Sequence, residues 1–150
     1  MFVSWMNYFY HTKGALMAKK ELKCQKFFQQ LLNIHAQIEE KTDELNYWQS
    51  QYDPCSADQA LSTEIQRRTE ELQGLIRKMN AQKMFATRLI DRLKDPIGRI
   101  ILRRRYIFCE PWSVIADLCG NMSIRNVYYI HTQSLEELEN IYCGYEAVFI

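Results

Sequence analysis

The residues best suited to recognising another molecule lie close together near residue 125. The guanidinium of Arg125 can donate two hydrogen bonds to O6 and N7 of guanine, and the amide of Asn126 can pair with adenine. Tyr128 and Tyr129 carry rings and hydroxyls that can contact thymine methyl groups or phosphates. We therefore expect base reading in the major groove of double-stranded DNA by Ile124, Arg125, Asn126, Tyr128 and Tyr129.

Groups that could hold the DNA backbone surround this segment. Arg103, Arg104 and Arg105 form a run of three bases, which would attract phosphates and position the protein without reading sequence. Ser113 is expected in the first turn of a helix, where free backbone N–H groups also attract phosphate. The arginine run can equally be a solvated helix face, and the tyrosine pair can equally pack against the rest of the protein. The expected phosphate contacts are Arg103, Arg104, Arg105, Ser113, Ser123 and Thr132.

Catalytic chemistry finds little support in the sequence. Acidic pairs such as Glu70 and Glu71 are adjacent along the chain, so their side chains point to different parts of a helix surface and form no general acid/base site. Glycine-rich phosphate loops and nucleophile elbows are missing. The five cysteines are odd in number and widely spaced, which favours neither a zinc site nor a disulfide framework. We expect no enzyme, no catalytic residue, no metal, no cofactor and no small-molecule substrate.

Three short helices with tight connections are expected to position the DNA-reading residues. The first begins at Pro96 and ends near Phe108, and the second begins at Trp112 and ends before Gly120, which can adopt the left-handed conformation of a helix C-cap. Ser123 can cap the third helix, over 124–138. Ala116 supplies the small residue needed where two helices cross closely, and Ile115, Leu118, Val127 and Ile130 supply core anchors. This pattern is typical of a helix-turn-helix.

Two long amphipathic helices precede that unit. Apolar residues recur at intervals of three and four between Phe27 and Tyr52, and again between Leu61 and Leu93. Polar residues interrupt the first row at Lys41 and the second at Arg68 and Gln82. Pro54 separates the two patterns, and Ser56 or Ser62 is expected to cap the second helix. Because the loop is short, the helices should fold back as an antiparallel hairpin. The two helices cannot bury their apolar faces fully against one another, so we expect the hairpin to form a homodimer.

Charge is segregated along the chain, although the net charge of the 150 residues is only +1. Residues 39–64 hold seven acids and one base, a net of −6, whereas residues 66–105 hold twelve bases and four acids, a net of +8. A strongly basic central stretch is consistent with a nucleic-acid partner. The chain has no apolar run long enough to span a membrane, and a cytoplasmic location is expected.

The segment 97–138 resembles a known family in three places. These are Ile97-Gly-Arg-Ile-Ile-Leu-Arg-Arg-Arg-Tyr, Trp112-Ser-Val-Ile-Ala-Asp-Leu, and Ser123-Ile-Arg-Asn-Val-Tyr with the later Ser134-Leu-Glu-Glu-Leu. They resemble region 4 of sigma-70 factors, and the whole layout is more similar to phage and prophage transcriptional regulators of the ArpU/RinA type. The resemblance implies binding to promoter DNA and activation of phage genes. The positions that match base-reading sites of the family are Ile124, Arg125, Tyr128 and Tyr129.

The resemblance is incomplete. Sigma factors often carry charged residues where this chain has Ile124 and Tyr128, so a target sequence different from a −35 element is expected. The turn from Gly120 to Ser123 is about one residue longer than the usual sigma turn. No segment resembles the domain that melts the −10 element, so the chain is not a complete sigma factor.

We therefore predict an all-α protein with an N-terminal antiparallel, coiled-coil-like helical hairpin and a region 4-like helix-turn-helix. Its predicted function is sequence-specific regulation of transcription, with RNA polymerase as a further partner. Two alternatives stay open: a small terminase subunit, which would form a ring of many subunits, and a coiled-coil adaptor that binds RNA polymerase or a sigma factor without contacting DNA. The expected divisions are a peripheral extension over 1–19 (with Met17 as an alternative start), the hairpin over 20–94, the DNA-binding unit over 95–140 and a tail over 141–150.

Overall fold

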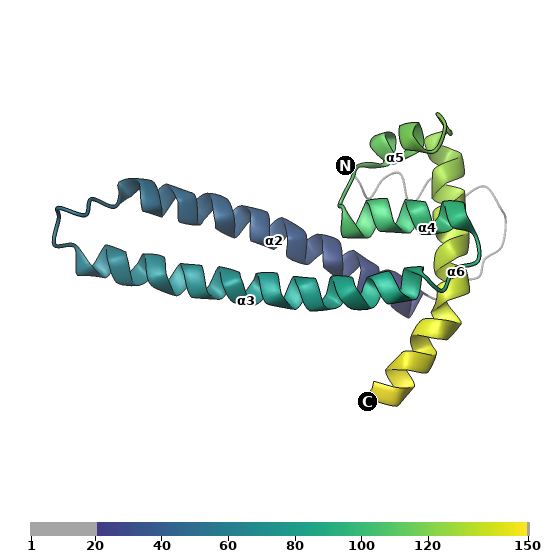
Figure 1. Cartoon of the computed structure of the whole chain (residues 1–150), viewed down its shortest axis with the longest axis horizontal. Helices are drawn as coiled ribbons and strands as arrows, with labels where there is room; N and C mark the ends of the chain where they lie inside the picture. The colour runs from purple at the N-terminus through teal and green to yellow at the C-terminus, as the bar shows by residue number, and fades with distance from the viewer. Residues whose placement is uncertain (1–20, 150) are drawn as a thin grey trace.

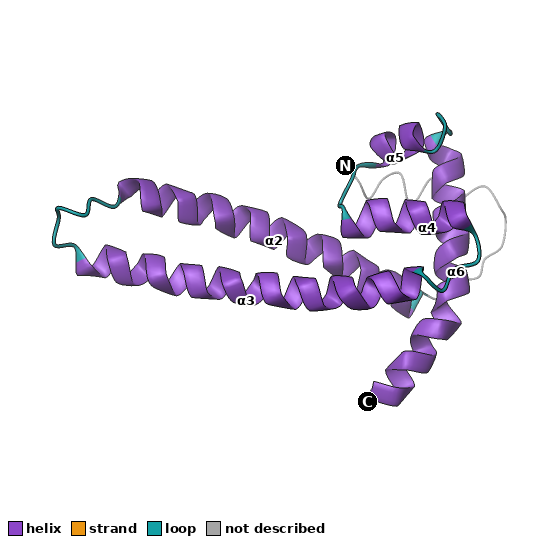
Figure 2. Cartoon of the chain, viewed as in Figure 1, coloured by secondary structure: helices purple, strands orange, loops and turns teal. Residues whose placement is uncertain are grey.

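The computed structural model describes residues 21–149, and every regular element in that range is helical (Figures 1 and 2). The N-terminal extension expected over 1–19 lies outside the described residues. Within the described range, no helix combines the length and the apolar character needed to cross a membrane. The elements are α2 (Lys23–Gln51), α3 (Gln59–Ile90), α4 (Pro96–Leu102), a π-helical turn (Arg103–Ile107), α5 (Trp112–Leu118) and α6 (Ile124–Phe149).

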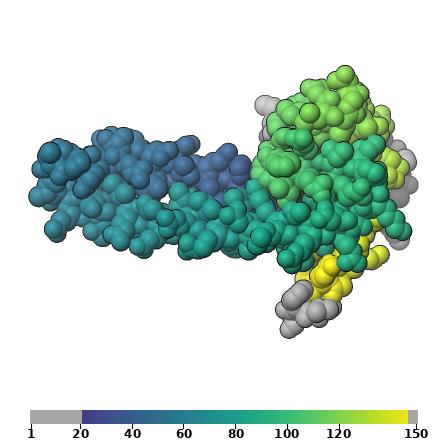
Figure 3. Space-filling model, in the orientation of Figure 1, coloured from purple at the N-terminus to yellow at the C-terminus, as the bar shows by residue number. Residues whose placement is uncertain are grey.

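The molecule consists of a long arm and a smaller head. Helices α2 and α3 run antiparallel, side by side, and form the arm, which extends well beyond the head in the space-filling view (Figure 3). The head contains α4, the π-helical turn and α5. Helix α6 passes through the head and across the base of the arm, and it contacts α2, α3, α4 and α5 (Figure 1). Helix α6 therefore connects α4 and α5 to the base of the arm, and the π-helical turn packs against α2, α3, α4 and α5.

The ends of the arm helices follow from local chemistry. Helix α2 ends at Gln51, just before Asp53 and Pro54, because the ring of a proline cannot continue the helical hydrogen-bond ladder. The expected cap of α3 by Ser56 or Ser62 is wrong. The side chain of Asp58 accepts a hydrogen bond from the backbone N–H of Leu61 at 3.0 Å, and its carboxylate also suits the positive end of the helix dipole.

Two clusters of buried side chains hold the head. The larger one lies where α6 crosses the base of the arm and includes Phe28, Leu89 and Leu135. The smaller one lies between α4, α5 and α6 and consists of Ile101, Ile115, Ala116 and Val127, with Trp112 packed against it. Ala116 is buried at the crossing of α5 and α6, as its small size predicts.

Helix α6 is longer than expected, because it continues to Phe149, whereas the sequence pattern predicts a separate tail that begins at residue 141. Tyr142 and Tyr145 on its last turns pack against the arm, at ring-centroid distances of 5.5 Å from Phe27 and 5.8 Å from Phe85, respectively. The hydroxyl of Tyr145 also accepts a hydrogen bond from Arg92 at 2.9 Å. These contacts with distant parts of the chain extend the helix across Gly144, a residue that would otherwise favour its end.

Gly98 allows α4 to approach α6 very closely. A Cβ atom at position 98 would lie 2.3 Å from Oγ of Ser134 and 3.5 Å from its Cβ. The first distance is far inside van der Waals contact, whereas the second is ordinary contact. The hydroxyl of Ser134 is held in place by its hydrogen bond to the carbonyl of Ile130 at 2.8 Å. No side chain therefore fits at position 98 unless Ser134 gives way.

We predict that Gly98→Ala lowers the free energy of unfolding by about 1–3 kcal/mol, the usual cost of overpacking a tight contact. Removal of the hydroxyl in the double variant Gly98→Ala/Ser134→Ala should recover most of that loss. Urea unfolding of the wild type, both single variants and the double variant measures the interaction free energy between the two substitutions. Strictly additive effects of the two substitutions would show that this contact does not limit the approach of α4 to α6.

Candidate nucleic-acid interface

A short turn joins α5 to α6 and sets the angle between them. Gly120 and Asn121 both have left-handed backbone conformations, with φ of 77° and 57°. Glycine adopts this conformation without steric cost and asparagine tolerates it better than most residues. The backbone N–H of Met122 donates to the carbonyl of Ala116 at 3.1 Å, which closes the turn. The left-handed conformation expected of Gly120 is confirmed.

Ser123 begins α6 in the expected way. Its hydroxyl oxygen accepts a hydrogen bond from the backbone N–H of Asn126 at 3.2 Å, so it satisfies one of the free donors in the first turn. Val127, one turn into the helix, is fully buried against α4 and α5. The cap and this anchor fix which side of the first turns of α6 faces outward.

Four of the five expected base-reading residues lie on the surface of that first part of α6. Ile124 is 51% exposed and Tyr129 is 59% exposed, and Arg125 and Asn126 are exposed as well. The outward position expected for Tyr128 is wrong. Its ring is half-buried, 5.4 Å from the ring of Trp112 and 5.4 Å from that of His131. Tyr128 therefore supports the helix from behind and contributes little to its outer surface.

Gln133 belongs to the same surface and was not among the expected residues. It is exposed, and its side-chain amide donates a hydrogen bond to the hydroxyl of Tyr129 at 2.7 Å. Arg125, Tyr129 and Gln133 are spaced four residues apart, so they form one row along α6. That spacing is visible in the sequence, and the third helix expected over 124–138 already includes Gln133, so the row could have been identified from the sequence alone.

This row, from Arg125 to Gln133, has the length of a groove contact. Eight residues of helix rise by about 12 Å, which is close to the width of the major groove. Two exposed acids, Glu136 and Glu137, follow on the next turn. Glu137 also accepts a hydrogen bond from the backbone N–H of Lys94 at 3.3 Å. Because carboxylates repel phosphates, the acids bound the surface that can face DNA.

The arginine triplet lies in the π-helical turn, and each of its members has a partner within the protein. Arg103 forms an ion pair with Asp91, and Arg104 forms one with Glu110 at 3.1 Å. Arg105 donates to the carbonyl of Glu110 at 3.1 Å, and its guanidinium lies 4.7 Å from the ring centroid of Trp112. The triplet thus joins α4 to α5 and to the end of α3.

The remaining expected phosphate contacts differ in accessibility. Ser113 is exposed in the first turn of α5, whereas Thr132 is half-buried and its hydroxyl donates to the carbonyl of Tyr128 at 3.0 Å.

Leu118, expected as a core anchor, is exposed instead. Helix α5 has only seven residues, and Ile115 and Ala116 take its buried side, so Leu118 at its end faces outward.

His131 is buried between the two clusters of the head. It is 3% exposed, and its Nε2 lies 2.7 Å from the hydroxyl of Tyr106, with which it shares a hydrogen bond. Burial disfavours the imidazolium and Arg105 repels it, which together lower the pKa of His131 to about 3. The side chain is therefore neutral at physiological pH and packs within the head instead of contacting phosphate.

Comparisons of the chain with protein-family models, with curated proteins and with solved structures found no match. The assignment of a function to this surface therefore depends on its geometry and on the chemistry of its residues.

We predict that His131 makes the stability of the protein depend on pH. The unfolded chain binds a proton at this histidine below about pH 6.5, while the folded chain does so only near pH 3. The unfolded state is therefore favoured as the pH falls between these values. From about pH 7 to about pH 5 the free energy of unfolding should fall by about 2 kcal/mol more in the wild type than in His131→Gln.

Glutamine cannot titrate but can still bond to the hydroxyl of Tyr106, so it is the matched control. Urea unfolding of both proteins at several pH values gives the two slopes, and the contributions of all other groups cancel in their difference. Equal slopes would mean that His131 binds a proton in the folded protein at the same pH as in the unfolded chain, which would contradict this prediction.

Proposed function

We propose that the protein binds double-stranded DNA sequence-specifically, by placing the first turns of α6 in the major groove. The observation that carries this proposal is the exposed row of Arg125, Tyr129 and Gln133, with Asn126 beside it, on a rigidly packed helix. The row is about as long as the groove is wide. The α5–turn–α6 unit has the features of a helix-turn-helix: a small residue at the crossing, a left-handed turn and a capped second helix.

In this proposal each exposed side chain has a chemically suitable target. Arg125 donates two hydrogen bonds to guanine, and the amides of Asn126 and Gln133 suit adenine. Ile124, at the start of the helix, offers an apolar surface for a thymine methyl group. The hydrogen bond from Gln133 to Tyr129 restricts both side chains before DNA arrives, which reduces the entropy lost on binding.

Backbone contacts would come from the edges of the same surface. Ser113 and Ser123, both exposed, lie at the N-terminal ends of α5 and α6 and can approach phosphates. Arg103 and Arg104 are partly exposed and have further N–H donors, but their charges are already paired with Asp91 and Glu110. Their contribution to phosphate binding is therefore smaller than that of a run of three solvated arginines.

We further propose that DNA binding serves regulation of transcription near a promoter, in the manner of the ArpU/RinA-type phage and prophage regulators that segment 97–138 resembles. RNA polymerase bound to the same promoter is then the partner that a DNA-bound regulator would contact. No catalytic step is part of this function.

A second candidate function is a protein-binding adaptor without DNA contact. Its support is the number of apolar side chains exposed on the head. Ile97 and Ile100 lie one turn apart on α4, and Val114 and Leu118 lie one turn apart on α5. These pairs would suit an apolar protein surface. In that case the purified protein would not bind DNA at low salt.

We predict that Arg125→Ala removes a base preference. Selection of binding sites from a random pool of double-stranded DNA identifies the preferred sequence, and fluorescence anisotropy then compares it with a scrambled duplex. Loss of a bidentate contact to guanine should weaken binding to the preferred site by about 1–3 kcal/mol relative to the scrambled duplex. The expected result is a relaxed preference at one base pair.

The matched control is Arg88→Ala, which removes the same charge from an exposed position on α3. It should leave the ratio of preferred to scrambled binding unchanged. If Arg125→Ala weakens binding to both duplexes equally, Arg125 contacts phosphate and does not read a base. If the wild type selects no sequence at all, the adaptor function is favoured.

A further inference from the structure

The arm carries opposite charge on its two halves. The half next to the head, residues 22–38 and 73–90, contains six bases and no acid. The half that ends at the interhelical loop, residues 39–72, contains nine acids and three bases, a net charge of −6. Ion pairs show which residues of the two helices lie opposite each other: Lys41 pairs with Glu71, and Glu44 with Arg68. The net charge therefore changes sign at the same distance along both helices, close to the middle of the arm.

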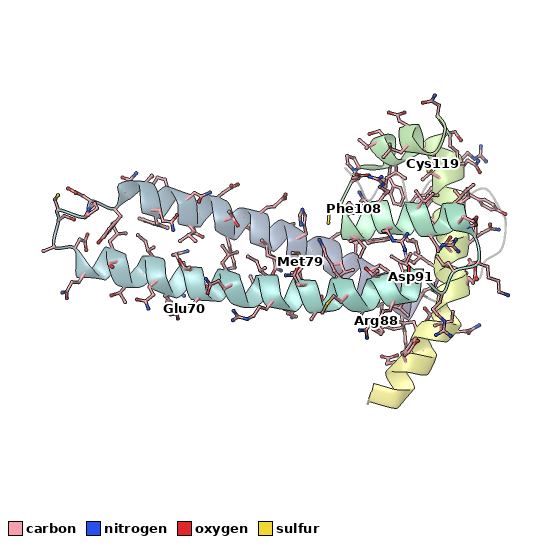
Figure 4. All side chains as sticks on the ribbon, in the orientation of Figure 1. Glu70, Met79, Arg88, Asp91, Phe108 and Cys119 are labelled. Atoms are coloured by element: carbon pink, nitrogen blue, oxygen red, sulfur yellow. The ribbon has the colours of Figure 1, made fainter. Side chains whose placement is uncertain are left out.

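Several of these charges have no partner of opposite charge within the described part of the chain. Arg77 and Lys78 in the basic half and Glu40 and Asp43 in the acidic half are exposed and form no ion pair there. In Figure 4, Glu70 and Arg88 lie on the side of α3 away from α2, whereas Met79 lies between the helices. The outer surface of the arm thus keeps most of its charge separation.

The apolar seam between α2 and α3 is also incompletely covered. Leu31, Ile34, Leu45 and Leu72 are buried in it. A groove along the basic half is lined by Ile34 and Leu75 among polar side chains, namely Gln30, Asn33, Gln37, Lys78 and Gln82. Other seam residues are only half-buried, namely Ile38, Trp48, Leu61, Ile65, Leu75 and Met79.

We propose that the arm binds a second copy of itself in antiparallel orientation, about a twofold axis near its middle. This arrangement places the acidic half of each copy against the basic half of the other, whereas a parallel arrangement would place like charges together. An arm of about 30 residues per helix is about 45 Å long and about 20 Å wide. It offers roughly 900 Å² per copy, which is close to the size of a standard stable interface.

The pairing would also cover the half-buried seam, as in a four-helix bundle. Gly74 lies near the proposed axis, and a Cβ atom there would meet only the guanidinium of Arg77, at 4.0 Å. The backbone of α3 can therefore be approached closely at this point. The proposal depends only on the arm and stands independently of DNA binding by α6.

The test uses the full chain without DNA, in sedimentation-equilibrium experiments at about 50 mM and about 500 mM salt. We expect a dimer whose dissociation constant rises with salt, because exposed charges are screened at high ionic strength. The variants Arg77→Glu/Lys78→Glu and Glu40→Lys/Asp43→Lys each place like charges together. Each should weaken self-association by roughly tenfold or more. Circular dichroism checks that both remain helical.

Two combinations provide the decisive control. An equimolar mixture of the two variants should form a heterodimer, and the quadruple variant should regain the self-association of the wild type, because the charges are opposite again. Glu136→Lys, a charge reversal at an exposed position on α6 outside the arm, should have no effect. A wild type that stays monomeric at low salt, or a dimer insensitive to the four arm substitutions, would overturn the proposal. Neither result would change the base preference measured for Arg125, so the two proposals fail separately.

Discussion

The carboxylate of Glu139 connects the head to the arm, and the rest of the arrangement depends on this contact. The backbone N–H groups of Lys23 and Cys24 each donate to it at 2.9 Å, so a residue of α6 caps the N-terminus of α2. Helix α2 has no side-chain cap of its own, since Leu22 occupies that position. Burial opposes the charge, but the hydrogen bonds from Cys24, Lys23 and Cys143 together outweigh it and lower the pKa of Glu139. An ionised carboxylate at this point also complements the helix dipole.

Within the head, His131 connects the two clusters of buried side chains. Its bond to Tyr106 reaches the cluster at the base of the arm, and its ring lies 4.9 Å from that of Trp112, which packs on the second cluster. Because His131 contacts a residue of the larger cluster and a residue packed on the smaller one, it helps to orient the α5–α6 turn relative to the arm. A fixed orientation matters for the proposed function, since base reading requires the row on α6 to be placed accurately.

Most features of the head that depend on neighbouring residues were predictable from the sequence, whereas the orientations that depend on distant contacts were not. The cap of α3 is an exception, because Asp58 and not a nearby serine occupies it. Gly120, Ser123 and Ala116 have the roles expected of them, because a turn, a cap and a small residue at a crossing are local requirements. Tyr128 faces Trp112 and the arginine triplet is used internally, because partners from other helices decided their orientation. The continuation of α6 to Phe149 and the requirement for glycine at position 98 likewise follow from packing against elements far away in the sequence.

The charge distribution links the two proposals. Residues 95–146 contain five bases and seven acids, so the head itself has a net charge of −2. Long-range attraction of one head to DNA is therefore weak, and affinity must come from short-range contacts and from the use of more than one head. Antiparallel pairing would neutralise the basic half of the arm with the acidic half of its partner, which would reduce the non-specific attraction to DNA further.

Antiparallel pairing would also place the two heads at opposite ends of the paired arms, about an arm length apart. Two recognition surfaces separated in this way suit half-sites more than one helical turn apart, and binding to both would favour the correct pair of sites over isolated matches.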